Sequence, residues 1–220
     1  MPEAVFFDLD GTLADTAPDL GGALNRLLAE QGRAELPQAI LRPHVSAGAR
    51  GLLRIGFGIA PDDPTYPLLH KRFLDIYESA LCEATTLFAG MDTLLDTLDA
   101  HGMVWGVVTN KPERFTLPLM ESLGLAARAA AIVGGDTTAR AKPDPLPLLH
   151  ACAVAGVAAT ASAYVGDDLR DIQAGRAAGM RTFAAAWGYL GDGPPIGEWG
   201  ADRTINEPEA LLADLGQGAW

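Results

Sequence analysis

The amino-acid sequence predicts an α/β protein, a Rossmann-like doubly wound parallel sheet into which a small α-helical cap domain is inserted. Short apolar runs alternate with longer amphipathic stretches along the 220 residues, as in repeated βα units. Most of the short runs are continuously apolar, which is typical of parallel strands covered on both faces. One long segment between the first two runs shows only helical spacing, and this segment is the predicted cap.

Six apolar runs are predicted strands, and five amphipathic stretches are predicted helices. The strands cover residues 4–8, 104–109, 130–133, 163–166, 181–185 and 203–205. The helices cover residues 91–100, 113–123, 145–154, 169–178 and 208–215. Because the two kinds of element alternate along the second half of the chain, they favour a single α/β sheet.

The connection after the first predicted strand is much longer than the later ones. Between residues 15 and 86 no convincing strand is found, and apolar residues recur at helical spacing. They form two groups: Leu20, Ala23, Leu24, Leu27 and Leu28, and then Leu68, Leu69, Phe73, Ile76 and Tyr77. We therefore predict a helical cap domain over residues 15–86 and a core domain over residues 1–14 and 87–220.

The composition excludes several classes of protein. Hydrophobic residues make up 49% of the chain and charged residues 20%, which is too apolar for a disordered chain. The formal net charge of −12 offers no basic surface for nucleic acid or for an anionic membrane. Only −2 of this charge falls on the predicted cap. A phosphate group that binds here therefore has to meet a local cation.

Neither a signal peptide nor a membrane span is predicted. The first ten residues lack a basic region and reach Asp8 after a short apolar run, and the longest uncharged stretch, residues 151–166, is too short to cross a bilayer. Cys82 and Cys152 are the two cysteines, and without CxxC spacing they support neither a disulfide framework nor a thiolate metal site. A cytoplasmic monomer or homodimer is expected.

The first candidate site follows the first predicted strand, where residues 8–12 read DLDGT. Open α/β sheets bind ligands at the carboxyl ends of their strands. Asp8 has the chemistry of a nucleophile, and Asp10 that of a general acid and base. Gly11 allows an unusual turn, and the Thr12 hydroxyl can bind a substrate oxyanion. A polar turn that merely ends a strand is the alternative interpretation.

Two further strand ends and a loop add polar groups. Thr109 and the backbone N–H of Asn110 follow the second predicted strand, where they can bind phosphoryl oxygens, although a strand-end threonine is often only structural. Lys142 precedes Pro143, which favours an extended backbone, and can direct its ammonium group to the sheet edge. The chain has only three lysines, Lys71, Lys111 and Lys142. Lys142 is therefore the candidate for the local cation.

A cluster of aspartates follows the fourth predicted strand, where residues 166–171 read GDDLRD. Carboxylates this close together repel each other unless a cation neutralises them, and hard oxygen ligands suit Mg²⁺. Asp167 is the best candidate metal ligand. Asp171 would orient a water molecule or Lys142 without binding the metal itself. A helix N-cap at Asp167 or Asp168 is the alternative.

The motifs together resemble a known family. DxDGT, Thr-Asn, Lys-Pro and GDxxxD occur in this order, with a helical insertion after the first, as in the haloacid dehalogenase-like superfamily of phosphohydrolases. The resemblance implies Asp8 as nucleophile, Asp10 as acid and base, and Thr109 and Lys142 as catalytic residues on the phosphoryl group. It also implies Mg²⁺ held by Asp8, the backbone carbonyl of Asp10, and Asp167.

Asp10 excludes two branches of the superfamily from the resemblance. The dehalogenases and the transport ATPases both lack a carboxylate at this position. The cap and residues 109–112, TNKP, resemble the phosphoglycolate phosphatase branch. Residues 166–172 and 199–202 are most similar to bacterial enzymes that dephosphorylate N-acetylmuramic acid 6-phosphate. In the cap, Ser46 and Arg50 are candidate substrate-binding residues, since the planar guanidinium of Arg50 can pair with a substrate carboxylate.

The expected activity is hydrolysis of a small phosphate monoester in two steps, through an aspartyl phosphate on Asp8. Two alternatives stay open. A sugar phosphomutase of the β-phosphoglucomutase kind shares the aspartate pair and the cap. A non-catalytic receiver module also gathers Asp, Thr, Lys and Mg²⁺ at strand ends, but it lacks a cap and an acid–base residue such as Asp10.

Overall fold

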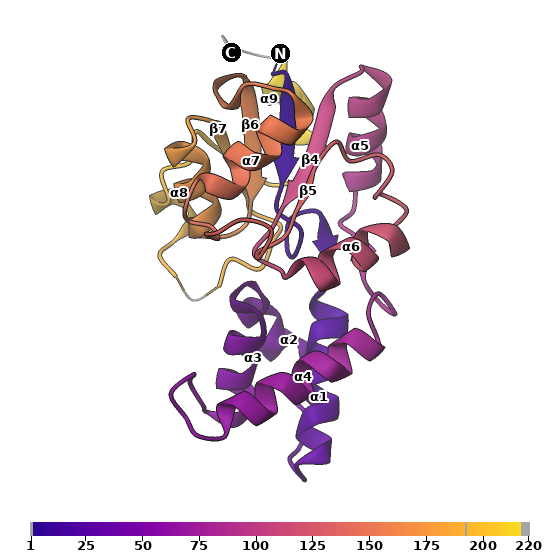
Figure 1. Cartoon of the computed structure of the whole chain (residues 1–220), viewed down its shortest axis with the longest axis vertical. Helices are drawn as coiled ribbons and strands as arrows, with labels where there is room; N and C mark the ends of the chain where they lie inside the picture. Colours follow the sequence, from indigo (N-terminus) through magenta and orange to yellow (C-terminus); the bar gives the residue numbers. More distant parts are fainter. Residues whose placement is uncertain (1, 192, 217–220) are drawn as a thin grey trace.

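The computed structural model describes residues 2–191 and 193–216, and its core is a parallel sheet (Figure 1). Within these residues the sheet has six strands in the order β5-β4-β1-β6-β7-β8, and every neighbouring pair is parallel. The strands are β1 Ala4–Phe7, β4 Val104–Val108, β5 Ile132–Val133, β6 Ser162–Gly166, β7 Arg181–Ala185 and β8 Arg203–Ile205. The predicted α/β fold is confirmed, and the six strands of this sheet differ from the predicted ones only at their ends.

Helices cover both faces of the sheet, which explains why its strands are apolar throughout. In β1, Val5 and Phe7 pack on one face, and Ala4 and Phe6 pack on the other. The helices are α5 Met91–Ala100, α6 Glu113–Ser122 and α9 Ala210–Leu215 on the first face, and α7 Leu146–Ala155 and α8 Leu169–Ala177 on the second. Successive strand residues point to opposite faces, so a doubly covered strand is apolar at every position.

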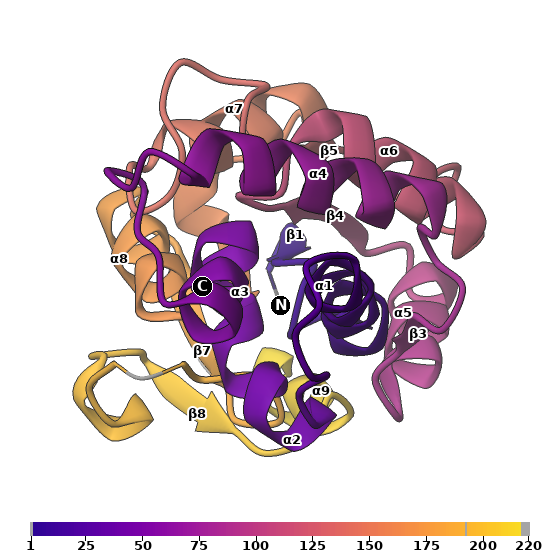
Figure 2. The same cartoon turned by 90° about the horizontal axis from the view of Figure 1, so that it is seen from below.

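A separate group of helices lies at one end of the sheet, at the lower end of the molecule in Figure 1 and toward the viewer in Figure 2. It consists of α1 Ala17–Glu30, α2 Gln38–Leu41, the 3₁₀ turn Arg42–Ala47, α3 Gly48–Phe57 and α4 Tyr66–Ser79. These helices bury their own apolar cluster, including Leu24, Leu27 and Phe73. Because this cluster forms one face of each main helix, the helical spacing of the sequence is explained by packing.

One residue of the predicted apolar stripe was assigned wrongly. Leu68 is 74% exposed, whereas Phe73, Ile76 and Tyr77 in the same helix are buried. Along α4, Leu68 lies four residues before Arg72, on the polar side of the helix, while Phe73 and Tyr77 repeat on the inner side.

Two very short strands join the helical segment to the sheet, at positions where the sequence predicted none. β2 Ala14–Asp15 pairs in antiparallel fashion with β3 Thr86–Leu87. Asp15 lies opposite Thr86, so the chain leaves the core and returns to it side by side. Two residues carry no readable strand periodicity, which is why the pattern missed them. We propose that the boundary between the core and cap domains crosses this ladder, at the limits of residues 15–86.

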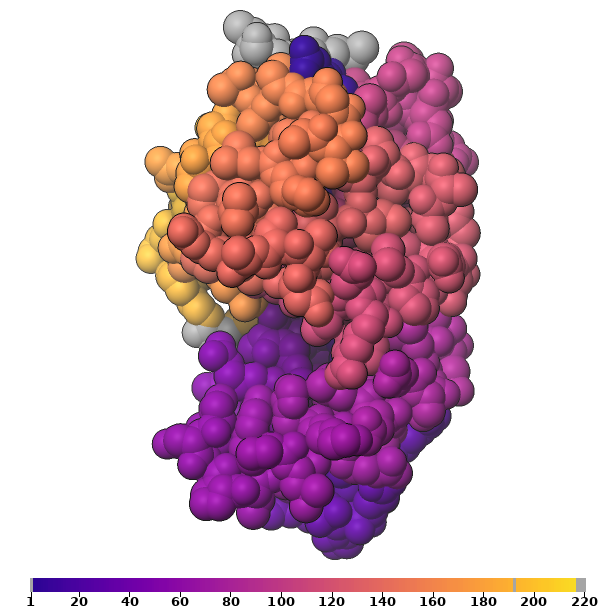
Figure 3. Space-filling view, in the orientation of Figure 1, coloured from indigo at the N-terminus to yellow at the C-terminus, as the bar shows by residue number. Residues whose placement is uncertain are grey.

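The carboxyl ends of β1, β4 and β6 face the helical segment. These three strands are adjacent, with β1 in the centre, and the chain crosses from one side of β1 to the other between β5 and β6. Such a switch point is where open α/β sheets form crevices. A recess is visible there between the helical segment and the sheet (Figure 3). In the part of the chain that is described, no helix has both the length and the hydropathy needed to cross a lipid bilayer.

Candidate active site

A cavity of about 280 Å³ lies between the strand ends and the helical segment. The core contributes charged and neutral polar side chains to its wall, and the helices contribute mostly apolar and aromatic ones. Those from the core include Asp8, Asp10, Thr109, Asn110, Lys111, Lys142 and Asp171. Those from the helical segment include Ser46, Arg50, Tyr66, His70, Phe73 and Tyr77. Most of the sequence-predicted residues of the core and of the cap thus line one cavity, whereas Thr12 and Asp167 are not among its lining residues.

Asp8 lies where β1 ends, at the centre of the sheet. Its backbone N–H still donates to the Val165 carbonyl at 2.9 Å, so the carboxylate projects directly from the rigid edge. Carboxylate Oδ1 accepts a hydrogen bond from the Leu9 N–H at 2.8 Å and lies 3.0 Å from Lys142 Nζ. The side chain is only 12% exposed. A buried carboxylate held by a strand end and an ammonium group has a defined direction of attack.

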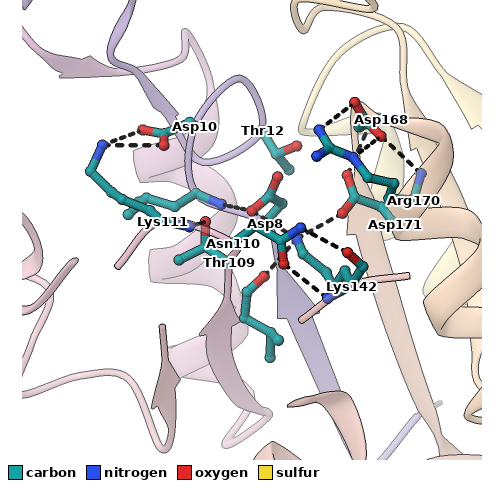
Figure 4. Close-up of polar contacts among 12 residues, drawn as sticks. Asp8, Asp10, Thr12, Thr109, Asn110, Lys111, Lys142, Asp168, Arg170 and Asp171 are labelled. Atoms are coloured by element: carbon teal, nitrogen blue, oxygen red, sulfur yellow. Dashed lines mark hydrogen bonds and ion pairs between the residues drawn. The ribbon is translucent and has the colours of Figure 1, made fainter. Parts of the chain in front are cut away.

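Lys142 is held at both its backbone and its ammonium group (Figure 4). The Asn110 side chain donates to the Lys142 carbonyl and accepts from the Lys142 N–H, both at 2.9 Å. Its Nζ lies 2.7 Å from Asp171 Oδ1 and donates to the Val108 carbonyl at 3.0 Å. Burial alone would lower the pKa of Lys142, but Asp171 and Asp8 outweigh burial and raise it. Lys142 is therefore a permanent cation beside Asp8.

Three buried carboxylates converge at this edge. One oxygen each from Asp8, Asp167 and Asp171 lies within 4.8 Å of the others, a spacing that could hold a metal ion. Burial raises the pKa of Asp167 well above its usual value, and the Asp8 and Asp171 charges add to the effect. A divalent cation would relieve this repulsion, and all-oxygen ligands fit a hard ion. The grouping differs from the predicted one in that Asp171 lies inside the cluster.

Asp167 is oriented by neighbours from distant parts of the chain. Its Oδ1 accepts from the Thr12 hydroxyl at 2.8 Å, and its Oδ2 accepts from the Tyr189 N–H at 2.8 Å. Thr12, which the sequence suggested as a substrate ligand, is fully buried and is not among the residues that line the cavity. Its hydroxyl is directed to Asp167 instead. Gly11 is required here because a Cβ at its φ of +89° would collide with the Asp167 carboxylate.

Asp168 starts helix α8 and confirms the N-cap alternative for one of the two neighbouring aspartates. Its side chain accepts from the Arg170 N–H at 2.9 Å, and the Asp171 carboxylate accepts from the Asp168 N–H at 3.0 Å. This reciprocal pair is a capping box. Arg170 also donates to the Ser46 carbonyl at 2.7 Å, so the start of α8 contacts the helical segment directly.

Asp10 projects away from the Asp8 cluster, toward Lys111 (Figure 4). Lys111 Nζ lies 3.0 Å from Asp10 Oδ1 and 3.2 Å from Asp10 Oδ2. The Lys111 side chain is only 4% exposed. Burial disfavours its charge, but the Asp10 carboxylate outweighs burial and raises the pKa of Lys111. The sequence motifs assigned no role to Lys111, although the scarcity of lysines in the chain was a signal that could have found it.

The two cap candidates differ in their surroundings. Ser46 Oγ is 3.4 Å from Asp167 Oδ2, close to the acidic cluster. Arg50 lies on α3 at the exposed side of the cavity, and no ion pair to it is found among the described residues. An arginine without an acidic partner on a cavity wall is suited to an anionic ligand.

Thr109, at the end of β4, is 3% exposed and also lines the cavity. Its hydroxyl accepts a hydrogen bond from the Lys111 N–H at 3.2 Å.

Comparison with known proteins identifies the family. The profile of the haloacid dehalogenase-like hydrolases matches residues 5–185. The chain belongs to the haloacid dehalogenase-like hydrolase family. It is 47% identical to a phosphoglycolate phosphatase of Xanthomonas campestris pv. campestris, over 96% of this chain and 95% of the relative. It is 40% identical to an N-acetylmuramic acid 6-phosphate phosphatase of Pseudomonas aeruginosa, over 96% of this chain and 93% of the relative.

Solved structures of the family share the whole fold. A crystal structure of a predicted phosphoglycolate phosphatase from Haemophilus somnus 129PT superposes with a TM-score of 0.85 at 25% identity, and 98% of each chain is covered. The likeness includes the inserted helices as well as the sheet, because nearly all of both chains takes part. The family and the fold expected from the four motifs are therefore confirmed.

Proposed function

We propose that this protein hydrolyses a small phosphate monoester with the help of Mg²⁺, through a phosphorylated Asp8. The observation that carries the proposal is the position of Asp8, which lies on the cavity wall, 3.0 Å from the Lys142 ammonium, and belongs to a buried carboxylate cluster with Asp167 and Asp171. A nucleophile, a fixed cation and a cluster that could hold a metal are the groups that phosphoryl transfer needs. The names of the similar relatives, both phosphatases, support the same reaction.

In the first step an Asp8 oxygen attacks phosphorus while the bond to the alcohol oxygen breaks, and Asp10 gives that oxygen a proton. In the second step Asp10 takes a proton from water, which attacks phosphorus and releases phosphate and free Asp8. Lys142 stabilises the negative charge on the transferred group in both steps. Because Lys111 holds Asp10 in this structure, the Asp10 carboxylate has to turn toward the ester oxygen before it can act.

Mg²⁺ is the proposed metal, held by Asp8, Asp167 and the backbone carbonyl of Asp10, with Asp171 oriented toward Lys142. When bound, a hard dication neutralises phosphoryl oxygens and the repulsion between the carboxylates. The buried and mutually repelling oxygens of Asp8 and Asp167 fit such an ion. Thr12 and the Tyr189 N–H hold Asp167 in place for it, as the groups around metal ligands generally do.

The proposed substrates carry a carboxylate as well as a phosphate, which makes 2-phosphoglycolate and N-acetylmuramic acid 6-phosphate the leading candidates. Both are the substrates that the names of the relatives state. Arg50, without an acidic partner in the described part of the chain, is the group proposed to bind that carboxylate. The apolar helical wall and the recess seen in Figure 3 leave room for an organic group beyond the phosphate.

We expect steady release of inorganic phosphate from at least one of these two esters with Mg²⁺ present, and none with excess EDTA. A panel of phosphorylated metabolites, assayed for phosphate with and without EDTA, tests this. Activity that is unchanged by EDTA would contradict the metal proposal. Conversion of a sugar phosphate into its isomer without net phosphate release would support a mutase, and a stable phosphoprotein without turnover would support a receiver.

Replacing Arg50 with methionine is expected to raise KM for a carboxylated phosphate ester by about tenfold or more, the effect of losing one hydrogen-bonded ion pair. Arg50→Lys should recover part of this loss, because lysine keeps the charge but not the planar fork. Steady-state kinetics on 2-phosphoglycolate and on p-nitrophenyl phosphate, which has no carboxylate, measure the difference. An equal rise in KM for both esters would argue against a carboxylate contact.

A further inference from the structure

One buried hydroxyl in the cavity wall has no hydrogen-bond partner among the residues that the structure describes. Tyr77, in helix α4, is 1% exposed, and its ring packs edge-on against Phe115 with centroids 5.5 Å apart. Its hydroxyl is the one buried side-chain polar atom without a hydrogen-bond partner among the described residues. Buried polar groups are nearly always satisfied, because an unmade hydrogen bond costs free energy. Lys111 acts on this hydroxyl, but an ammonium group has no lone pair and cannot accept its hydrogen. An O–H group without an acceptor next to a cavity therefore points to an acceptor atom of a ligand.

The surroundings of Tyr77 place it near the proposed acid and base. Lys111 Nζ lies 4.7 Å from the centre of the Tyr77 ring, in a cation–π contact, while its hydrogen bonds go to the Asp10 carboxylate. Tyr77, Lys111 and Asp10 all line the cavity. Asp10 is the residue proposed to protonate the leaving alcohol. Tyr77 consequently lies on the side of the cavity where the alcohol part of the ester has to sit.

The chemistry of the hydroxyl limits what it can bind. Burial raises the pKa of Tyr77 to about 12, although the Lys111 charge acts in the opposite direction. The hydroxyl is therefore protonated at neutral pH and has a hydrogen to donate. An acceptor oxygen can take this hydrogen, such as a hydroxyl, ether or carbonyl oxygen near the ester bond. A purely hydrocarbon leaving group offers no such atom.

We propose that the Tyr77 hydroxyl donates a hydrogen bond to an oxygen of the leaving alcohol, so that Tyr77 selects oxygen-rich phosphate esters over alkyl and aryl ones. The inference rests on the proposed phosphatase function and adds a selection rule to it. Arg50 would recognise the negative charge of the substrate, and Tyr77 a neutral oxygen close to the reacting bond. The two contacts come from different cap helices, α3 and α4.

The test is the variant Tyr77→Phe, which removes the hydroxyl and keeps the ring that packs on Phe115. For each enzyme, kcat/KM is measured on the oxygen-rich ester that the wild type hydrolyses best and on p-nitrophenyl phosphate. We expect the ratio of the two kcat/KM values to fall about five- to tenfold, the effect of one net hydrogen bond. Urea unfolding should show no loss of stability, because the variant removes an unsatisfied buried group.

The matched control is Tyr66→Phe, which removes a phenol hydroxyl from the same cavity at a half-buried position. An unchanged ratio in Tyr77→Phe, or the same fall in both variants, would overturn the proposal. A wild-type protein that hydrolyses neither ester would instead overturn the proposed phosphatase function. The two failures are therefore told apart by the wild-type rates alone.

Discussion

Asp8→Asn is expected to lower kcat for phosphate-ester hydrolysis by about 10⁶-fold, the scale seen when a covalent nucleophile is removed. Asparagine matches the shape of Asp8, and its amide oxygen can still accept the Leu9 N–H hydrogen bond. It lacks the negative charge needed to attack phosphorus. Single-turnover assays with Mg²⁺ measure the loss, and no phosphorylated protein should form.

Stability provides the control for Asp8→Asn. The Asp8 charge raises the pKa of both Asp167 and Asp171, so removing it relieves repulsion in the folded state, and Lys142, which loses its ion pair with Asp8, keeps Asp171 as a partner at 2.7 Å. The free energy of unfolding in urea should therefore equal or exceed that of the wild type when no metal is present. Asp62→Asn, an exposed change in the cap, should keep wild-type activity. An Asp8→Asn enzyme with full Mg²⁺-dependent turnover would refute the proposed nucleophile.

Lys142→Met is expected to lower both activity and stability. Removing one partner of a buried ion pair costs about 3–5 kcal/mol, because the other charge is left uncompensated. Here two carboxylates, Asp8 at 3.0 Å and Asp171 at 2.7 Å, would lose their cation. The loss of a charge that stabilises the transferred group should lower kcat by about 10²-fold or more. Urea unfolding and steady-state kinetics measure the two effects.

Metal addition separates the electrostatic cause from a loss of packing. Mg²⁺ should restore part of the free energy of unfolding that Lys142→Met loses, since the metal ion can neutralise the same carboxylates in place of the lysine. Lys71→Met serves as the control, because Lys71 is 75% exposed and pairs with Asp75 one helical turn away. Its stability should change by less than about 0.5 kcal/mol. A Lys142→Met variant as stable as the wild type without metal would contradict this interpretation of the cluster.

Local patterns predicted most of the fold. The six strands were found because doubly covered strands are apolar at every position, and the helices were found from their one-sided spacing. The proposed limits of the cap, residues 15 and 86, are paired with each other in the β2–β3 ladder, although the ladder itself is too short to show a period. Leu68 was misassigned because an apolar residue beside a stripe looks like part of it, and only packing shows which side is inside.

For the candidate site too, local patterns predicted some features and the packing of the chain decided the others. The strand pattern alone predicted that Asp8, Thr109 and Asp167 lie at one edge of the sheet, since each follows a strand and parallel strands end at one edge. Only the tertiary structure decided that Thr12 contacts Asp167, that Lys111 holds Asp10, and that the Tyr77 hydroxyl is unpaired. The physical reason is the distance along the chain between the residues involved. The end of a strand follows from the periodicity of neighbouring residues. The partner of a side chain comes from a distant segment, whose packing no local pattern describes.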